Sequence, residues 1–209
     1  MVKFILLHQN QSNMKKGYIV LIAVIAFFLI IFIWVKGTYN TLVTEDESVT
    51  AGWHQVETEY QRRLDLIPNL VSTVQGAANF EKSTLTDVIN ARANATKITI
   101  DPSHLDAASL QQFQQAQTQV SSSLSRLLVS VEQYPDLKAN QNFRDLQAQL
   151  EGTENRISVA RKRFNDVAQN YDTHIRTFPA NIFAGMFGLQ YRAYFEADAA
   201  ASSAPKVKF

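Results

Sequence analysis

Charged side chains that could bind a ligand lie in one short stretch of this 209-residue chain, Tyr60–Val71 (YQRRLDLIPNLV). There, Arg62 and Arg63 stand beside Asp65 and an apolar run that contains Pro68. Guanidinium groups bind carboxylates and phosphates through paired hydrogen bonds, so these arginines could hold a ligand or a protein partner. The alternative is that nearby carboxylates neutralise both arginines on a kinked helix.

A second polar cluster occurs later in the chain and has the same two interpretations. It is either a face that binds a partner or a polar layer inside a helical bundle. We favour the polar layer, in which the buried groups must pair with one another. The members of this cluster are Glu154, Asn155, Arg156 and Arg161.

The residue types that define common catalytic and metal sites are absent or isolated. The chain has no cysteine, which excludes disulfides and thiolate sites. Its histidines lie outside any HExxH or di-iron pattern, and the serines at 121–123 lack a nucleophile elbow. We therefore expect no catalytic residues, cofactor or metal; the alternative is an enzyme with an unfamiliar polar site. The histidines are His8, His54, His104 and His174.

An uncharged apolar run near the N-terminus, Gly17–Val35, predicts a transmembrane helix. As a helix it would be about 28 Å long, close to the thickness of a bilayer core. Tyr18 and Trp34 stand at its two ends, where aromatic belts occur. A cleaved signal peptide should end in small residues, whereas this run ends in Trp34, Val35 and Lys36. We therefore expect a retained membrane anchor.

Positive charge around this run predicts its orientation. Lys3, Lys15 and Lys16 precede it, and Lys36 follows it. By the positive-inside rule, the N-terminus should lie in the cytoplasm and the C-terminal domain outside it. Met14 begins a stretch that resembles a natural start, so either Met1 or Met14 could be the first residue.

Apolar residues beyond the anchor recur at helical spacing, which predicts an all-α, elongated antiparallel bundle of three long helices and a shorter one. Asp106 and Asn140 are expected helix N-caps, while Pro135 and Pro179 should end helices. The shorter helix, within 79–96, should bury Leu85, Val88 and Ile89. Two further seams are Leu110, Phe113, Val120, Leu124, Leu127, Val131 and Tyr134, and Phe143, Leu146, Leu150, Thr153, Ile157, Ala160, Phe164, Val167, Tyr171, His174 and Phe178.

The first seam passes through Pro68 without losing phase. Trp53, Tyr60, Ile67 and Val74 share one heptad position. This continuity favours one long, kinked helix over about 38–78, which could run on from the membrane span. The alternative is a break, with Pro68 as the first residue of a new helix.

The same phase turns Arg63 inward and Arg62 outward. Glu59 lies four residues before Arg63, and Asp65 lies three residues after Arg62. Both spacings suit ion pairs within one helix. We therefore expect the cluster to pair with itself, although Arg62 and Arg63 remain candidates for partner binding.

Two C-terminal segments are also candidates for partner binding. The aromatic segment 178–195 could cap one end of the bundle or contact a partner or a membrane, with Phe183, Phe187, Tyr194 and Phe195 as candidates. The last residues end in Val207, Lys208 and Phe209 after Pro205. That tail could dock into a peptide-binding groove, fray, or fold back onto the bundle.

Several motifs in order resemble those of the LemA family of bacterial membrane proteins. The resemblance covers about 39–209, with small departures at Gln75 and Leu189. It implies one N-terminal anchor and a helical bundle, and it implies no known reaction. Family members are often encoded beside membrane-bound metalloproteases, which suggests such a partner. The motifs are YQRRLDLIPNLVSTVQG, EKSTLTDVINAR, YPDLKANQNF, TENRISVARKRFND, IRTFPANIFAGMFG and YFEA.

Together these features predict a single-pass, non-enzymatic interaction or scaffold protein of the bacterial inner (cytoplasmic) membrane. The net charge of +1 gives no support for a nucleic-acid partner. Expected partners are the lipid bilayer, an unidentified protein such as a membrane protease, or another copy of the chain; a sensor or ligand-binding bundle is the alternative. The expected segments are a tail (1–16), a transmembrane helix (17–36), the bundle (37–178), an aromatic cap (179–198) and a flexible tail (199–209).

The predicted orientation can be tested with a reporter fusion. Alkaline phosphatase fused after Phe209 should be active, because it folds only outside the cytoplasm. A fusion to a reporter that works only in the cytoplasm is the control, and it should be inactive. Activity of the cytoplasmic reporter alone would reverse the predicted orientation.

Overall fold

Helices make up almost all of the chain. The computed structural model describes the backbone of residues 2–76 and 80–196 and the side chains from Gly17 onward, and this part contains no strand. The all-α prediction is therefore confirmed. The elements are α1 (Val2–Gln75), α2 (Lys82–Thr96), a 3₁₀ turn η1 (Pro102–His104), α3 (Ala107–Val131), α4 (Pro135–Ala139), α5 (Gln141–Arg176) and α6 (Ala180–Met186).

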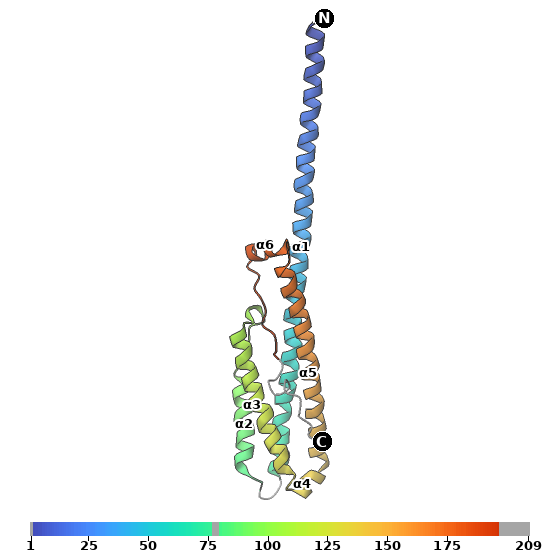
Figure 1. Ribbon diagram of the computed structural model, residues 1–209. Helices are drawn as coiled ribbons and strands as arrows, with labels where there is room; N and C mark the ends of the chain where they lie inside the picture. Colours follow the sequence, from blue (N-terminus) through green and yellow to red (C-terminus); the bar gives the residue numbers. More distant parts are fainter. Residues whose placement is uncertain (1, 77–79, 197–209) are drawn as a thin grey trace, which may run out of the picture.

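The four longest helices form an elongated bundle in which successive helices run in opposite directions (Figure 1). α5 packs along α1, and α3 packs along α2. Short polar caps fix where two of these helices begin, as the sequence predicts. Asp106 accepts a hydrogen bond from the backbone N–H of Ser109 at 2.7 Å, and Asn140 accepts one from that of Phe143 at 3.3 Å.

All four residues of the α1 heptad position are buried as predicted, and so is the α3 seam from Leu110 to Val131. Tyr134, the last predicted residue of that seam, lies beyond the end of α3 and is half-buried. In α2, Leu85 and Val88 are buried but Ile89 is exposed, because Ile89 lies one residue beyond the narrow apolar stripe of this short helix. The α5 seam begins as predicted and then shifts by one residue. Ala168 and Ile175 are buried in place of Val167 and His174.

The shift in α5 follows from the geometry of a straight helix. An α-helix has 3.6 residues per turn, so a strict seven-residue repeat drifts by about 20° per heptad. After several heptads the residue that faces α1 is one position further along the chain. Phe178, the last predicted seam residue, lies beyond the end of α5 and is exposed.

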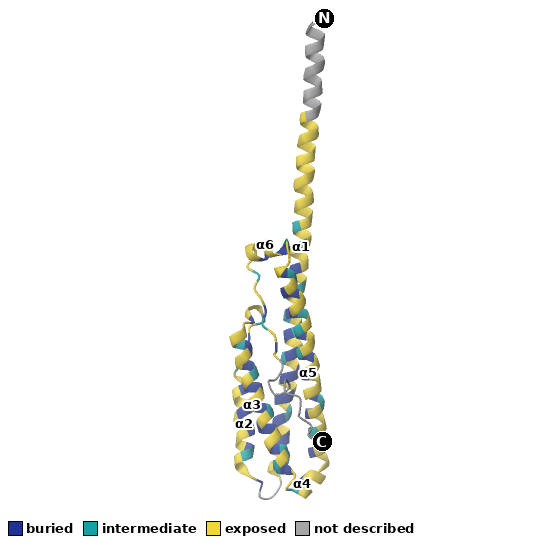
Figure 2. Cartoon of the chain, in the orientation of Figure 1, coloured by how far each residue is buried: buried dark blue, intermediate teal, exposed yellow. Residues whose placement is uncertain are grey.

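The N-terminal part of α1 projects from the bundle, and its large apolar side chains from Tyr18 to Trp34 are exposed (Figure 2). None of the residues in the most apolar window of this helix is buried against the rest of the protein. By length and composition, this stretch could cross a membrane. α1 then continues into the bundle without interruption, so the exposed stretch and the buried seam belong to one helix.

Pro68 lies inside α1, as the preferred interpretation of the heptad phase requires. Proline has no N–H group, so the carbonyl of Leu64 loses its partner in the helix. In the folded protein, Arg92 of α2 donates a hydrogen bond from Nε to this carbonyl oxygen at 2.9 Å. Because of the proline, the Leu64 carbonyl is free to accept this hydrogen bond, which joins α2 to α1.

This tie predicts coupling between Arg92 and Pro68. The Arg92→Ala substitution leaves the buried Leu64 carbonyl without a side-chain donor and should lower the free energy of unfolding by about 1–3 kcal/mol. In a Pro68→Ala background, the restored N–H can bond to the same carbonyl, so Arg92→Ala should cost less. Urea unfolding of the full-length chain and its three variants in detergent micelles measures this coupling.

Arg126→Ala is the matched control. Arg126 pairs with Asp87 at 3.2 Å, and both side chains are largely exposed. Its removal should change stability by less than about 1 kcal/mol in either background. Equal losses for Arg92→Ala with and without Pro68 would show that the proline does not create the acceptor.

Candidate functional site

A buried arginine lies at the centre of the bundle. Arg63 of α1 is only 3% exposed and reaches α3 and α5. Its Nη1 donates to both carboxylate oxygens of Glu154 at 3.0 Å and to Ser121 Oγ at 2.7 Å. Its Nη2 donates to Gln117 Oε1 at 2.7 Å and to the Gln117 carbonyl at 3.2 Å. One guanidinium therefore links three helices.

A second ion pair joins α1 to α5 one turn away. Arg156 Nε donates to Glu59 Oε2 at 3.1 Å, and Arg156 Nη2 donates to Thr153 Oγ1 at 2.8 Å. Gln55 donates to the other oxygen of Glu59 at 3.2 Å. Glu154 and Arg156 thus belong to a polar layer between helices, as the favoured interpretation of their cluster predicts. The other two members do not, because Asn155 is exposed and Arg161 donates to the backbone carbonyl of Glu196 at 3.0 Å.

The predicted pairing within α1 is wrong, because both expected pairs are replaced. Glu59 bonds to Arg156 and Arg63 bonds to Glu154, while Asp65 accepts from Gln61 at 2.8 Å. The cause is that Glu59 and Arg63 both face inward, where α5 presents opposite charges in a less hydrated environment. Such pairs are stronger than exposed pairs along one helix.

The polar layer separates two apolar cores. The core far from the exposed apolar stretch includes Leu64, Val120 and Leu150, whereas the near core includes Tyr60 and Ile157. Arg63 lies at the boundary between them. A shift of α5 along α1 would separate Arg63 from Glu154 in a buried environment. The layer therefore fixes the axial register of the helices, since unpaired buried charges are costly.

A groove opens beside Arg63 between α3 and α5. Its volume is about 150 Å³, and Arg63 and Glu154 form one end of it. The Nε atom of Arg63 is buried and has no hydrogen-bond partner in the part of the chain that the structure describes. The remaining lining combines three leucines with four polar residues: Ser121, Leu124, Ser125, Leu128, Gln147, Leu150 and Glu151.

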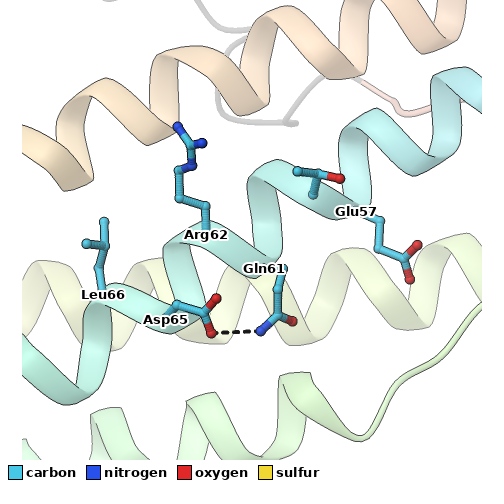
Figure 3. Close-up of a pocket in the computed structure, with 6 residues that line it drawn as sticks. Glu57, Gln61, Arg62, Asp65 and Leu66 are labelled. Carbon is cyan, nitrogen blue, oxygen red and sulfur yellow. Dashed lines mark hydrogen bonds between the residues drawn. The ribbon is translucent and has the colours of Figure 1, made fainter.

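Arg62 is exposed on the surface of α1, about 100° around the helix from Arg63 (Figure 3). It lines a shallow, open depression together with Glu57, Gln61, Asp65 and Leu66, all of which come from α1. Figure 3 shows these side chains spread along the helix surface, with only Gln61 and Asp65 bonded to each other. Groups from a single helix do not converge around a ligand, so this depression is a weaker candidate than the groove.

A third polar cluster, near the base of the exposed helix, has no counterpart in the sequence predictions. The buried Arg192 pairs with Asp46 and donates to the Ser103 carbonyl, and its backbone N–H donates to Asp172 at 3.1 Å. Tyr194 donates to the other oxygen of Asp172. These contacts join α1, α5, the loop before α3 and the C-terminal segment.

Two tyrosines stay protonated at neutral pH: Tyr194 of this cluster and Tyr171, whose ring lies 5.7 Å from the Arg192 guanidinium. Burial raises the pKa of Tyr171 to about 12, and the carboxylate of Asp46 adds to this effect. Burial also raises the pKa of Tyr194 well above its usual range, as does its hydrogen bond to Asp172. Both groups therefore act as neutral structural side chains rather than as bases.

The predicted aromatic candidates have different locations. Phe183 contacts Trp34, with ring centroids 5.5 Å apart, and Phe187 contacts Tyr39 at 4.7 Å. Phe195 is buried, stacked on the Trp53 ring at 6.0 Å, so it is a core residue and cannot meet a partner. Val207 and Phe209 lie outside the described residues.

The sequence patterns did not indicate that Phe195 and Arg192 would be buried. Gly188 has a φ of 70°, which lets the chain reverse after α6 and run back along the bundle in an extended form. Asn165 then holds Phe195 by two hydrogen bonds, at 2.8 Å and 2.9 Å. A single glycine after a short helix is a weak signal for such a segment.

No metal site is evident in the described part of the chain, where no three His, Asp or Glu residues lie close enough to share an ion. His174 pairs with Glu45 at 2.8 Å, His54 with Glu57 at 3.3 Å, and His104 with Asp101 at 3.0 Å. Each of these three histidines therefore pairs with one acidic neighbour.

Fold and site together define a helical-bundle protein with a long apolar N-terminal helix and a buried polar layer. The model of the LemA family matches residues 52–209, more than half of the chain, and the chain therefore belongs to the LemA family. The chain is also similar to Protein LemA from Metamycoplasma hominis. The two are 23% identical over 186 residues, which cover 89% of this chain and 81% of that protein.

The polar layer predicts unequal effects for two neighbouring acids. Glu154→Ala leaves the buried Arg63 without its counterion and should lower the free energy of unfolding by about 1–3 kcal/mol. Glu151→Ala is the matched control, because Glu151 bonds only along its own helix, to Gln147 at 3.1 Å. It should cost less than about 0.5 kcal/mol. Denaturant unfolding of the full-length protein measures both, and equal losses would contradict the role of Arg63.

Proposed function

We propose that this LemA-family protein is a membrane-anchored, non-enzymatic interaction protein that binds a partner helix in the groove between α3 and α5. One observation carries the proposal: the groove is lined by three leucines, the buried Leu124 and Leu150 and the half-buried Leu128, and it lies beside the ion pair between the buried Arg63 and the half-exposed Glu154. α1 and α5 pack closely along their length, whereas α3 and α5 do not. The bundle therefore has one open side.

The dimensions of the groove favour a protein partner over a small ligand. Its volume of about 150 Å³ is below the roughly 300 Å³ of the smallest typical ligand pockets. A space of this size takes one or two apolar side chains of a docked helix. Such helices bind through anchors spaced three or four residues apart.

The rim of the groove specifies the chemistry of that partner. Leu124, Leu128 and Leu150 offer an apolar floor, and Glu151 and Glu154 add negative charge along the α5 side. Glu154 is 51% exposed even though it pairs with Arg63. A complementary helix would place apolar residues against the leucines and a lysine or arginine beside the acids.

Membrane attachment is part of the same proposal. The exposed apolar stretch of α1 would span the cytoplasmic membrane of a bacterium once, with the bundle outside the cytoplasm. Three lysines before the stretch and one after it support this orientation. Because α1 is continuous, the groove would be held at a fixed height above the membrane. The partner would then be another protein of the cell envelope.

Photocrosslinking at adjacent positions of α3 tests the groove. A photoreactive amino acid in place of Leu128 should crosslink to a partner in intact cells, because Leu128 lines the groove. The same amino acid in place of Val129 is the matched control, since Val129 is exposed but lies outside the groove. Peptide mapping of the crosslinked product should find an apolar helix flanked by basic residues.

Filling the groove provides an independent check. Ser125→Trp should abolish the Leu128 crosslink and leave the melting temperature nearly unchanged, because Ser125 lies on the open side. Mass spectrometry would distinguish a membrane protease from a second copy of the chain. Equal crosslinks at Leu128 and Val129, or a small molecule crosslinked at Leu128, would overturn the proposal.

A further inference from the structure

α6 lies at the end of the bundle from which the apolar part of α1 emerges (Figure 1). Its contacts fix its height along α1. Phe183 packs on Trp34 with ring centroids 5.5 Å apart, and Phe187 packs on Tyr39 at 4.7 Å. Trp34 is almost the last residue of the uncharged run, and Lys36 follows it. α6 therefore lies beside the last turns of the apolar stretch.

The outer side of α6 carries large apolar side chains. Phe178, just before α6, is 80% exposed, Ile182 is 54% exposed and Met186 is 73% exposed. Ile182 and Met186 are four residues apart and therefore share one face of α6, whereas Phe178 lies in the turn before it. Ala180 and Ala184 are buried on the side that faces the bundle. The helix thus packs on the protein through Ala180, Ala184 and Phe183 and turns Ile182 and Met186 away from it.

The height of α6 matches the boundary of a bilayer that α1 would span. Trp34 and Tyr39 are five positions apart, about 7.5 Å along a helix. The headgroup layer on each side of a bilayer core is about 5–8 Å thick. If the apolar stretch lies in the hydrocarbon core, residues that contact Trp34 and Tyr39 must lie within this layer.

Charge near α6 has the pattern of an interfacial segment. The run 177–191 contains no charged residue, and Arg176, exposed at the end of α5, precedes it. Lys36 is exposed on α1 at a similar height. Both cations could contact lipid phosphates, which attract lysine and arginine at membrane surfaces. The nearest acids of α1, Glu45 and Asp46, lie about 13–15 Å further along the helix, inside the bundle.

We propose that Phe178, Ile182 and Met186 form a foot that inserts into the interface of the same bilayer that α1 spans. The inference rests on the proposed membrane anchor. The foot gives the bundle a second attachment point, beside the transmembrane helix. Two attachments prevent the rod-like bundle from tilting freely, so they fix the orientation of the groove relative to the membrane.

Fluorescence in vesicles tests the foot. The chain has no cysteine, so one introduced cysteine can be labelled selectively with an environment-sensitive dye. The full-length protein is reconstituted into phosphatidylcholine and phosphatidylglycerol vesicles that contain lipids with a nitroxide quencher on the acyl chain. Ile182→Cys reports on the foot, and Val159→Cys is the control, at an exposed aliphatic position of α5 away from α6.

The dye at position 182 should emit at shorter wavelength than the dye at position 159. Lipid quenching at 182 should be about three times stronger, because interfacial helices lie roughly 5–10 Å deep in the headgroup region. Equal quenching at both positions would overturn the foot. A blue shift at 182 without quenching would also overturn it, because it would show that protein rather than lipid covers α6.

A third label separates this inference from the proposal beneath it. Ile25→Cys lies in the middle of the apolar stretch and should be quenched if α1 spans the bilayer. Quenching at 25 but not at 182 would reject the foot and keep the anchor. Absence of quenching at 25 would reject both. Melting temperatures of the labelled variants should match that of the unmodified chain, because all three side chains are exposed.

Discussion

The hydrogen bond from Arg92 to the Leu64 carbonyl replaces the backbone hydrogen bond that Pro68 removes from α1, the helix around which the bundle packs. A proline inside a helix removes one donor and commonly kinks or breaks the helix. Here α1 continues past Pro68, so Ile67 and Val74 stay in phase with Trp53 and Tyr60. The same hydrogen bond also attaches α2 to α1. One helix can therefore carry an exposed apolar stretch at one end and the central packing surface of the bundle at the other.

Arg63 has a different task within the same helix. Apolar seams alone permit neighbouring helices to slide by a turn, because one leucine can replace another with little loss. A buried guanidinium bonded to α3 and α5 permits one register only. Such a group adds little net stability but penalises every alternative alignment. The two apolar cores on either side of it supply the stability that the polar layer does not.

Predictions from the sequence were most accurate for features that depend on a single helix. Heptad phase predicted both the continuity through Pro68 and the inward direction of Arg63, and local capping chemistry predicted Asp106 and Asn140. They failed for side chains whose hydrogen-bond partners lie on another helix. Arg63 has a suitable acid one turn away but bonds to Glu154, because spacing along a chain says nothing of which helices meet. The displaced seam of α5 has another cause, since its residues follow the period of a real helix rather than an ideal heptad.

The path of the C-terminal segment has a consequence for how the chain is made. Trp53 stacks on Phe195, which is synthesised only after every helix of the bundle has been made. The near core is therefore incomplete until the last part of the domain has left the ribosome. A chain truncated before Phe195 would leave one face of the Trp53 ring uncovered, although Phe113 and Phe164 would still contact its edges. Chaperones and proteases recognise such exposed apolar surfaces on incomplete proteins. Contacts between such distant residues also form late in folding, because closing a long loop costs entropy before it gains any contact. Phe195 thus makes completion of the near core dependent on completion of the chain.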